Sequence, residues 1–109
     1  TLRKISQDTG NPVFERVLDA FKQEAEKLVS QLVEQVQQEP LDFLTIGETA
    51  HALKSMSGNS GAKALYELCR ELEEKMKNTQ SDNIHSLVQR IQLAFTTSSE
   101  KLETFRHVG

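Results

Sequence analysis

One histidine with a lysine a single helical turn away offers the clearest chemistry in this sequence. His51 is followed by Lys54 at a spacing of three residues, which places both side chains on one face of a helix. A neutral imidazole is a competent nucleophile near pH 7, and a lysine one turn away can neutralise an anion that the imidazole carries. We therefore predict a site at which His51 takes up an anionic group.

Small residues continue the same helical face beyond the histidine. The face that carries His51 also carries Glu48, Lys54, Ser55 and Gly58. Ser55 and Gly58 leave a low patch beside the imidazole, although a glycine inside a helix costs about 1 kcal/mol relative to alanine. We interpret Glu48, Ser55 and Gly58 as a docking surface that a second molecule approaches closely, and we expect position 58 to face solvent. The alternative is an ordinary surface histidine near a glycine-rich helix end.

A carboxylate further along the chain is a candidate partner for the imidazole. If Gly61 forms the turn between two antiparallel helices, His51 lies about 15 Å before the turn and Glu73 about 18 Å after it. The mismatch is less than one turn, so the two side chains can meet. A carboxylate that accepts a hydrogen bond from Nδ1–H would leave Nε2 as the nucleophile. The alternative is a solvated carboxylate beside Glu71 and Glu74.

Helical periodicity indicates which elements position these residues. Apolar residues recur at alternating spacings of three and four, and we predict helices over about 12–39, 42–60, 62–77 and 84–105. No stretch alternates like a strand, so we predict an all-α fold, an antiparallel four-helix bundle with up-down-up-down topology. For the N-terminal helix, the prediction includes two variants: the helix is split, or a short extra helix precedes it. Residues 1–10 are expected to form an arm or lead-in and residues 11–109 the bundle.

Composition excludes several classes of function. The chain has 109 residues, enough for one domain, with a net charge of −3 and a single cysteine. It therefore lacks the excess of basic residues that is typical of nucleic-acid binding and the cysteines of a disulfide framework. The sequence also contains no run of about 20 apolar residues, the length of a membrane helix. The motifs GxxxxGK[ST], HExxH and GxSxG are also missing. We expect a cytoplasmic domain that contacts neither nucleic acid nor membrane.

The segment around His51 resembles a known family, the histidine-containing phosphotransfer (HPt) domains. Their phosphoacceptor helix has the approximate pattern HxLKxSxxxxGA, which is matched here by His51, Leu53, Lys54, Gly61 and Ala62. The family's continuation LxxLCxxLE is matched by Leu65, Leu68, Cys69, Leu72 and Glu73. The chain departs from the commonest pattern at Ser55 and Met56, where the family has Gly and Ser. Because Ser55 is still small, we expect the docking surface to be kept.

The resemblance implies a carrier in a phosphorelay. HPt domains pass phosphoryl groups between aspartates of response-regulator receiver domains. His51 would then be the phosphoacceptor, Lys54 would stabilise the phosphoryl charge and Glu73 would orient His51. The domain would hold no cofactor, since Mg²⁺ is expected in the partner receiver domain, and it would have no independent kinase activity.

The parent protein and two alternative functions are further expectations. The first residue, Thr1, favours a domain from a bacterial hybrid sensor histidine kinase anchored in the inner membrane, with a freestanding relay protein as the alternative. Kinase and receiver domains of such a parent chain would also be partners. One alternative is the phosphoacceptor domain of a chemotaxis-type kinase, in which a kinase domain phosphorylates the histidine. The other is a helical adaptor that binds a receiver without being phosphorylated, although the presence of both His51 and Lys54 argues against it.

Overall fold

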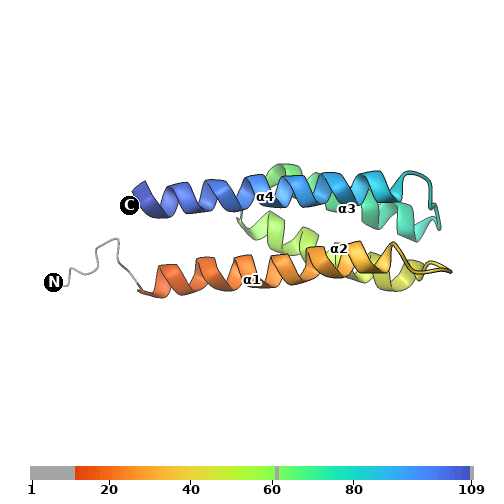
Figure 1. The fold of residues 1–109 in the computed structure, drawn as a ribbon, viewed down its shortest axis with the longest axis horizontal. Coiled ribbons are helices and arrows are strands. Elements are labelled where there is room, and N and C mark those ends of the chain that lie inside the picture. The colour runs from red at the N-terminus through yellow and green to blue at the C-terminus, as the bar shows by residue number, and fades with distance from the viewer. Residues whose placement is uncertain (1–11, 61, 109) are drawn as a thin grey trace.

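Four α-helices form the part of the chain that the structure, a computed structural model, describes: residues 12–60 and 62–108. The helices are α1 (Pro12–Gln35), α2 (Phe43–Ser60), α3 (Lys63–Lys77) and α4 (Ile84–Val108). Helix α2 contacts α3, α3 contacts α4, and α1 contacts both α2 and α4. Figure 1 shows the chain reversing direction at each connection. The predicted all-α four-helix bundle is confirmed, whereas the predicted N-terminal arm and the turn residue Gly61 lie outside the described residues.

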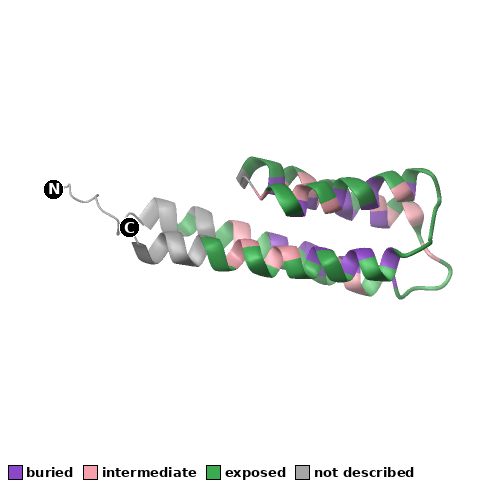
Figure 2. Ribbon diagram, turned by 90° about the horizontal axis from the view of Figure 1, so that it is seen from above, coloured by how far each residue is buried: buried purple, intermediate pink, exposed green. Residues whose placement is uncertain are grey.

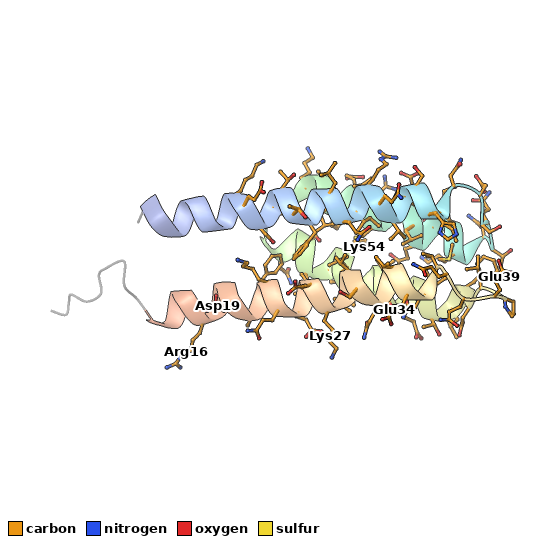
Figure 3. All side chains as sticks on the ribbon, in the orientation of Figure 1. Arg16, Asp19, Lys27, Glu34, Glu39 and Lys54 are labelled. Atoms are coloured by element: carbon orange, nitrogen blue, oxygen red, sulfur yellow. The ribbon has the colours of Figure 1, made fainter. Side chains whose placement is uncertain are left out.

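A single apolar core fills the space between the helices. Each helix contributes a fully buried aliphatic side chain: Leu32, Leu53, Leu72 and Ile91. Figure 2 shows the buried positions on the faces by which the helices meet. Charged side chains of α1 such as Arg16 and Lys27 point away from the bundle (Figure 3). Removal of the apolar faces from water is therefore what holds the four helices in register.

Helix α1 ends earlier than the sequence predicts. The prediction that it runs to Glu39 is wrong, because the helix stops at Gln35. Beyond that point the N–H groups of Gln37 and Gln38 bond to carbonyls only three residues back, at 3.1 and 3.3 Å, and Pro40 follows. Such tightened last turns are common where a helix terminates, and proline cannot continue it.

Side-chain and backbone caps fix the ends of the next two helices. Asp42 stands before α2, and its carboxylate accepts hydrogen bonds from the Thr45 N–H at 3.1 Å and from the Thr45 hydroxyl at 2.7 Å. At the end of α3, the N–H groups of Thr79 and Gln80 bond back to carbonyls of the last turn, with Thr79 at a φ of 49°. This is the Schellman arrangement of a helix C-terminus.

The helices differ in length, and the difference shapes the bundle. Helices α1 and α4 have 24 and 25 residues, whereas α2 and α3 have 18 and 15. The first and last helices therefore continue past the connection between α2 and α3 (Figure 1). Helix α1 is continuous, so the variant of the prediction in which the N-terminal helix is split is wrong. The other variant, a short extra helix before α1, would lie outside the described residues. Within the described ranges, no helix is long and apolar enough to span a membrane.

Candidate functional site

His51 lies in the middle of α2 and faces away from the core. Its side chain is 59% exposed. Ala50 and Leu53, which flank it along the helix, are fully buried and anchor the opposite face of α2 in the core. The packing of the helix therefore leaves the imidazole open to solvent.

A nearly buried carboxylate on α3 holds His51 and Lys54 at the same time. Glu73 Oε2 lies 2.9 Å from His51 Nδ1, and Glu73 Oε1 lies 2.7 Å from Lys54 Nζ. The contact between His51 and Glu73 is the one that the helix register predicts. Because an ionised carboxylate only accepts hydrogen bonds, Nδ1 carries a proton, and in the neutral ring Nε2 then keeps a free lone pair.

The surroundings of Glu73 keep this cluster charged. Burial by itself raises the pKa of the Glu73 carboxyl, but hydrogen bonds from Lys54 and His51 outweigh it and hold the pKa below its ordinary value. The hydrogen bond to Glu73 in turn raises the pKa of Lys54 against the opposing effect of burial. The site therefore holds a carboxylate and an ammonium group beside the imidazole at neutral pH.

A hollow of about 410 Å³ lies next to His51, between α2 and α3. Its wall includes Phe43, Leu44, Gly47 and Met76, none of which the sequence analysis assigned to a functional site. Leu44 is 73% exposed. Leu44 precedes His51 by seven residues, or two turns, so the two side chains lie on the same face of the helix. An apolar residue on this face, outside the apolar stripe, is the signal in the sequence that could have identified Leu44. A Cβ atom at Gly47 would lie 3.4 Å from Met76 Cβ, which shows how closely α3 approaches here.

The predicted docking residues lie on both sides of the imidazole. Glu48 belongs to the wall of the hollow beside His51, and Ser55 is exposed one turn beyond it. Gly58 is also exposed, but a Cβ atom there would lie 3.3 Å from the ring of Tyr66 on α3. Position 58 therefore faces solvent as expected, but a side chain there would also contact the ring of Tyr66.

Two other potentially reactive side chains make no hydrogen bond or ion pair with this cluster among the described residues. Cys69 is fully buried, and burial raises the pKa of its thiol to about 12, so the reactive thiolate is not available at neutral pH. His85 is exposed near the start of α4. The described residues contain no group of three His, Cys, Asp or Glu side chains that could hold a metal ion.

Comparison with known proteins identifies the class of protein. The family model of the Hpt domain matches residues 16–103, which include the whole His51, Lys54 and Glu73 cluster. The chain therefore belongs to the Hpt domain family. Membership of this family supports a role as a phosphorelay carrier.

Individual relatives agree with this assignment. Histidine-containing phosphotransfer protein 2 of Arabidopsis thaliana is 28% identical over 104 residues, which cover 94% of this chain and 66% of that protein. The chain thus spans just under two thirds of the length of this curated relative. The crystal structure of the histidine-containing phosphotransfer protein ZmHP2 from maize has the same fold, with a TM-score of 0.82 and 18% identity over 98% of this chain and 86% of that one. Both relatives come from plants, so the bacterial origin of the chain stays a prediction.

Proposed function

We propose that this domain carries phosphoryl groups between receiver domains and that Nε2 of His51 is the acceptor atom. The observation that supports this most directly is the hydrogen bond from Nδ1 of an exposed histidine to a nearly buried carboxylate, Glu73. The bond fixes the tautomer of the ring and leaves the Nε2 lone pair for attack.

The chemistry is a direct displacement at phosphorus. The Nε2 lone pair of His51 attacks the phosphorus of an aspartyl phosphate on the receiver. The nitrogen–phosphorus bond forms, the bond from phosphorus to the aspartyl oxygen breaks, and its electron pair stays on the released aspartate carboxylate. Positive charge grows on the ring during the attack, and Glu73 stabilises it through the hydrogen bond to Nδ1–H. Transfer to the next receiver is the same reaction in reverse.

Lys54 supplies the positive charge that the phosphoryl group needs in this proposal. It lies one turn from His51 on α2 and is held at 2.7 Å by the oxygen of Glu73 that does not bind the imidazole. Phosphoryl transfer passes through a loose transition state with charge on three oxygens, so a nearby ammonium group lowers the barrier. The Mg²⁺ for the reaction belongs to the receiver, as the family resemblance implies.

The hollow between α2 and α3 is the proposed contact area for the receiver. Its wall is mostly apolar, Leu44 stands exposed at its edge, and His51 opens onto it. Protein interfaces commonly have an apolar centre with a polar rim, which Glu48 provides here. We place the domain in the cytoplasm, where response regulators act, and include receiver and kinase domains of the same parent chain among its partners.

The test is phosphoryl transfer from a radiolabelled phospho-receiver in the presence of Mg²⁺. We expect label on the unmodified domain and on the His85→Gln control, and none on His51→Gln, with equal helix content by circular dichroism. Label on His51→Gln at the level of the unmodified domain would overturn the assignment. Binding of the receiver without transfer would instead identify an adaptor, and labelling only by a kinase domain would identify the chemotaxis type.

A further inference from the structure

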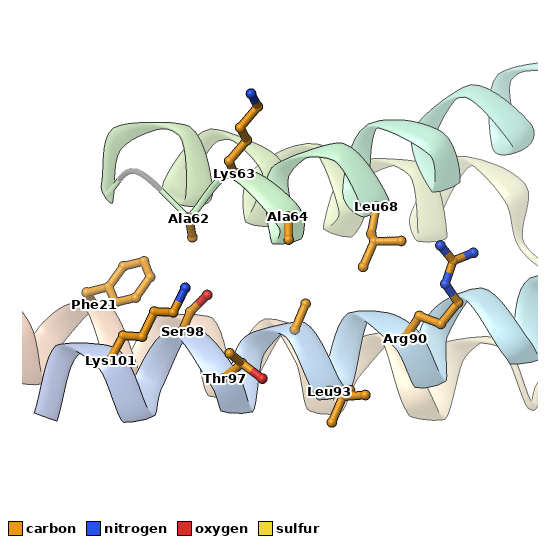
Figure 4. Close-up of a pocket in the computed structure, with 11 residues that line it drawn as sticks. Phe21, Ala62, Lys63, Ala64, Leu68, Arg90, Leu93, Thr97, Ser98 and Lys101 are labelled. Carbon is orange, nitrogen blue, oxygen red and sulfur yellow. The ribbon is translucent and has the colours of Figure 1, made fainter. Parts of the chain in front are cut away.

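A second hollow, of about 560 Å³, lies between α3 and α4 and shares no wall residue with the one beside His51. It opens near the start of α3, where the longer helices α1 and α4 continue past the α2–α3 connection (Figure 1). Figure 4 shows Leu68 of α3 and Phe21 of α1 directed into it, with Arg90 and Lys101 of α4 towards its two ends. Its interior is thus apolar, and its ends carry cations.

The charges around this hollow run against those of the whole domain. Lys63, Arg90 and Lys101 belong to its wall, which contains no acidic residue, although the chain as a whole has a net charge of −3. In the described ranges 12–60 and 62–108, no ion pair joins any of these three residues to a carboxylate. The three cations are therefore available to an acidic partner.

The length of the hollow along α4 fits a helix better than a compact ligand. Arg90, Ala94, Ser98 and Lys101 follow one another at three or four residues and span about 16 Å of helix. Ala94 and Ser98 between the two cations are small, so another helix can approach closely. Leu93, 68% exposed, adds apolar surface at the edge. An amphipathic helix in such a groove would set its own apolar anchors, at i, i+3, i+4 and i+7, between the two cations.

We propose that this groove binds an acidic amphipathic helix of a partner protein. Leucine-like side chains of that helix would pack against Leu68 and Phe21, and its carboxylates would pair with Lys63, Arg90 and Lys101. Charge argues against a second copy of the domain, because a two-fold contact would set these cations against each other. A membrane surface fits less well, since Phe21 and Leu68 line a hollow and only Leu93 projects from a helix face. This proposal is independent of phosphoryl transfer at His51.

The test uses a synthetic helical peptide of about 16 residues, about 24 Å long, with leucines at helical spacing flanked by glutamates. A matched peptide has lysine in place of each glutamate. In heteronuclear NMR titrations of the intact domain, we expect the glutamate peptide to shift the amide signals of Ala64, Leu68 and Ala94 and to leave that of Glu48 in place. The lysine peptide should bind at least about tenfold more weakly.

Charge reversal in the domain gives the matched control. The double variant with Arg90→Glu and Lys101→Glu should bind the glutamate peptide at least about tenfold more weakly. The control is the double variant with Arg16→Glu and Lys27→Glu, two residues on the exposed face of α1, which should bind the peptide as the unmodified domain does (Figure 3). Phosphoryl uptake on His51 should be equal in both variants, so this test is separate from that of the proposed function. Equal binding of the two peptides, signal shifts centred on Glu48, or binding to phosphatidylserine vesicles but not to the glutamate peptide would overturn the proposal.

Discussion

Tyr66 lies so close to Gly58 that a Cβ atom at position 58 would be 3.3 Å from the ring carbon Cδ2 of the tyrosine. Helix propensity alone would make Gly58→Ala stabilising by about 1 kcal/mol. Because the new methyl group must displace the ring, we expect less than half of that gain. In a Tyr66→Ala background the full gain should appear. Urea denaturation of the four proteins in this double-mutant cycle measures the coupling, and strictly additive effects would show that the ring does not restrict position 58.

Loss of the Glu73 carboxylate should release both groups that it holds. In Glu73→Ala, we expect the His51 ring to lose its strict preference for a proton on Nδ1, since Glu73 Oε2 is the acceptor for that proton. The transfer rate should fall by about tenfold or more, the effect of roughly 1.4 kcal/mol on a barrier. NMR of the ring nitrogens reports the tautomer. The matched control is Glu71→Ala, an exposed position on the same helix. A Glu73→Ala ring that keeps the unmodified tautomer would show that other groups orient His51.

Leu44→Asp should weaken receiver binding without unfolding the domain. Leu44 is 73% exposed at the edge of the hollow beside His51, so a carboxylate there removes an apolar contact and costs little in the free protein. We expect the Kd for a receiver to rise by about tenfold or more, because a carboxylate would be buried without a partner where the receiver covers an apolar side chain. Leu93→Asp is the matched control, because Leu93 is 68% exposed and lies on the wall of the other hollow. Equal loss of affinity in the two variants would contradict the proposed contact area.

Part of the stability of the domain should depend on the ionisation of Glu73. The pKa of this carboxyl is lower in the folded protein than the value of about 4.3 expected in the unfolded chain. Glu73 therefore contributes fully above about pH 6 and loses its contribution as the pH falls through the folded-state pKa. We expect the difference in unfolding free energy between the unmodified domain and Glu73→Gln to shrink from about pH 6 to pH 3. A difference that persists unchanged at pH 3 would be inconsistent with an ion pair at this position.

The end of α3 offers a stabilising substitution away from the site. Thr79 has a φ of 49°, in the left-handed region that β-branched residues rarely adopt and that asparagine tolerates. Thr79→Asn should raise the unfolding free energy by about 0.5–1 kcal/mol. Thr96→Asn is the control, since Thr96 lies inside α4 with its hydroxyl bonded to the Gln92 carbonyl. Thermal unfolding that shows no gain for Thr79→Asn over Thr96→Asn would argue against strain at position 79.

The sequence predicted the features that follow from helical register. The approach of Glu73 to His51 is of this kind, because both positions are counted from one turn between antiparallel helices. The end of α1 was missed because Pro40 is the first stop signal in the sequence, whereas the chain already leaves the helix after Gln35. The ring of Tyr66 over Gly58 was also missed, because a glycine has no side chain whose character would indicate a neighbour. The second bond of Glu73, to Lys54, depends on side-chain conformations that spacing does not determine.

The proposed chemistry is confined to one helical hairpin, with consequences for how the protein tolerates change. His51, Lys54, Glu73 and the hollow beside them all belong to α2 and α3, between residues 43 and 77, roughly a third of the chain. Helices α1 and α4 supply the apolar surface on which this hairpin rests. For the chemistry at His51, their sequences are therefore free to drift as long as buried positions such as Leu32 and Ile91 stay apolar. The hairpin is accordingly the natural segment to transplant when the specificity of such a relay is to be re-engineered.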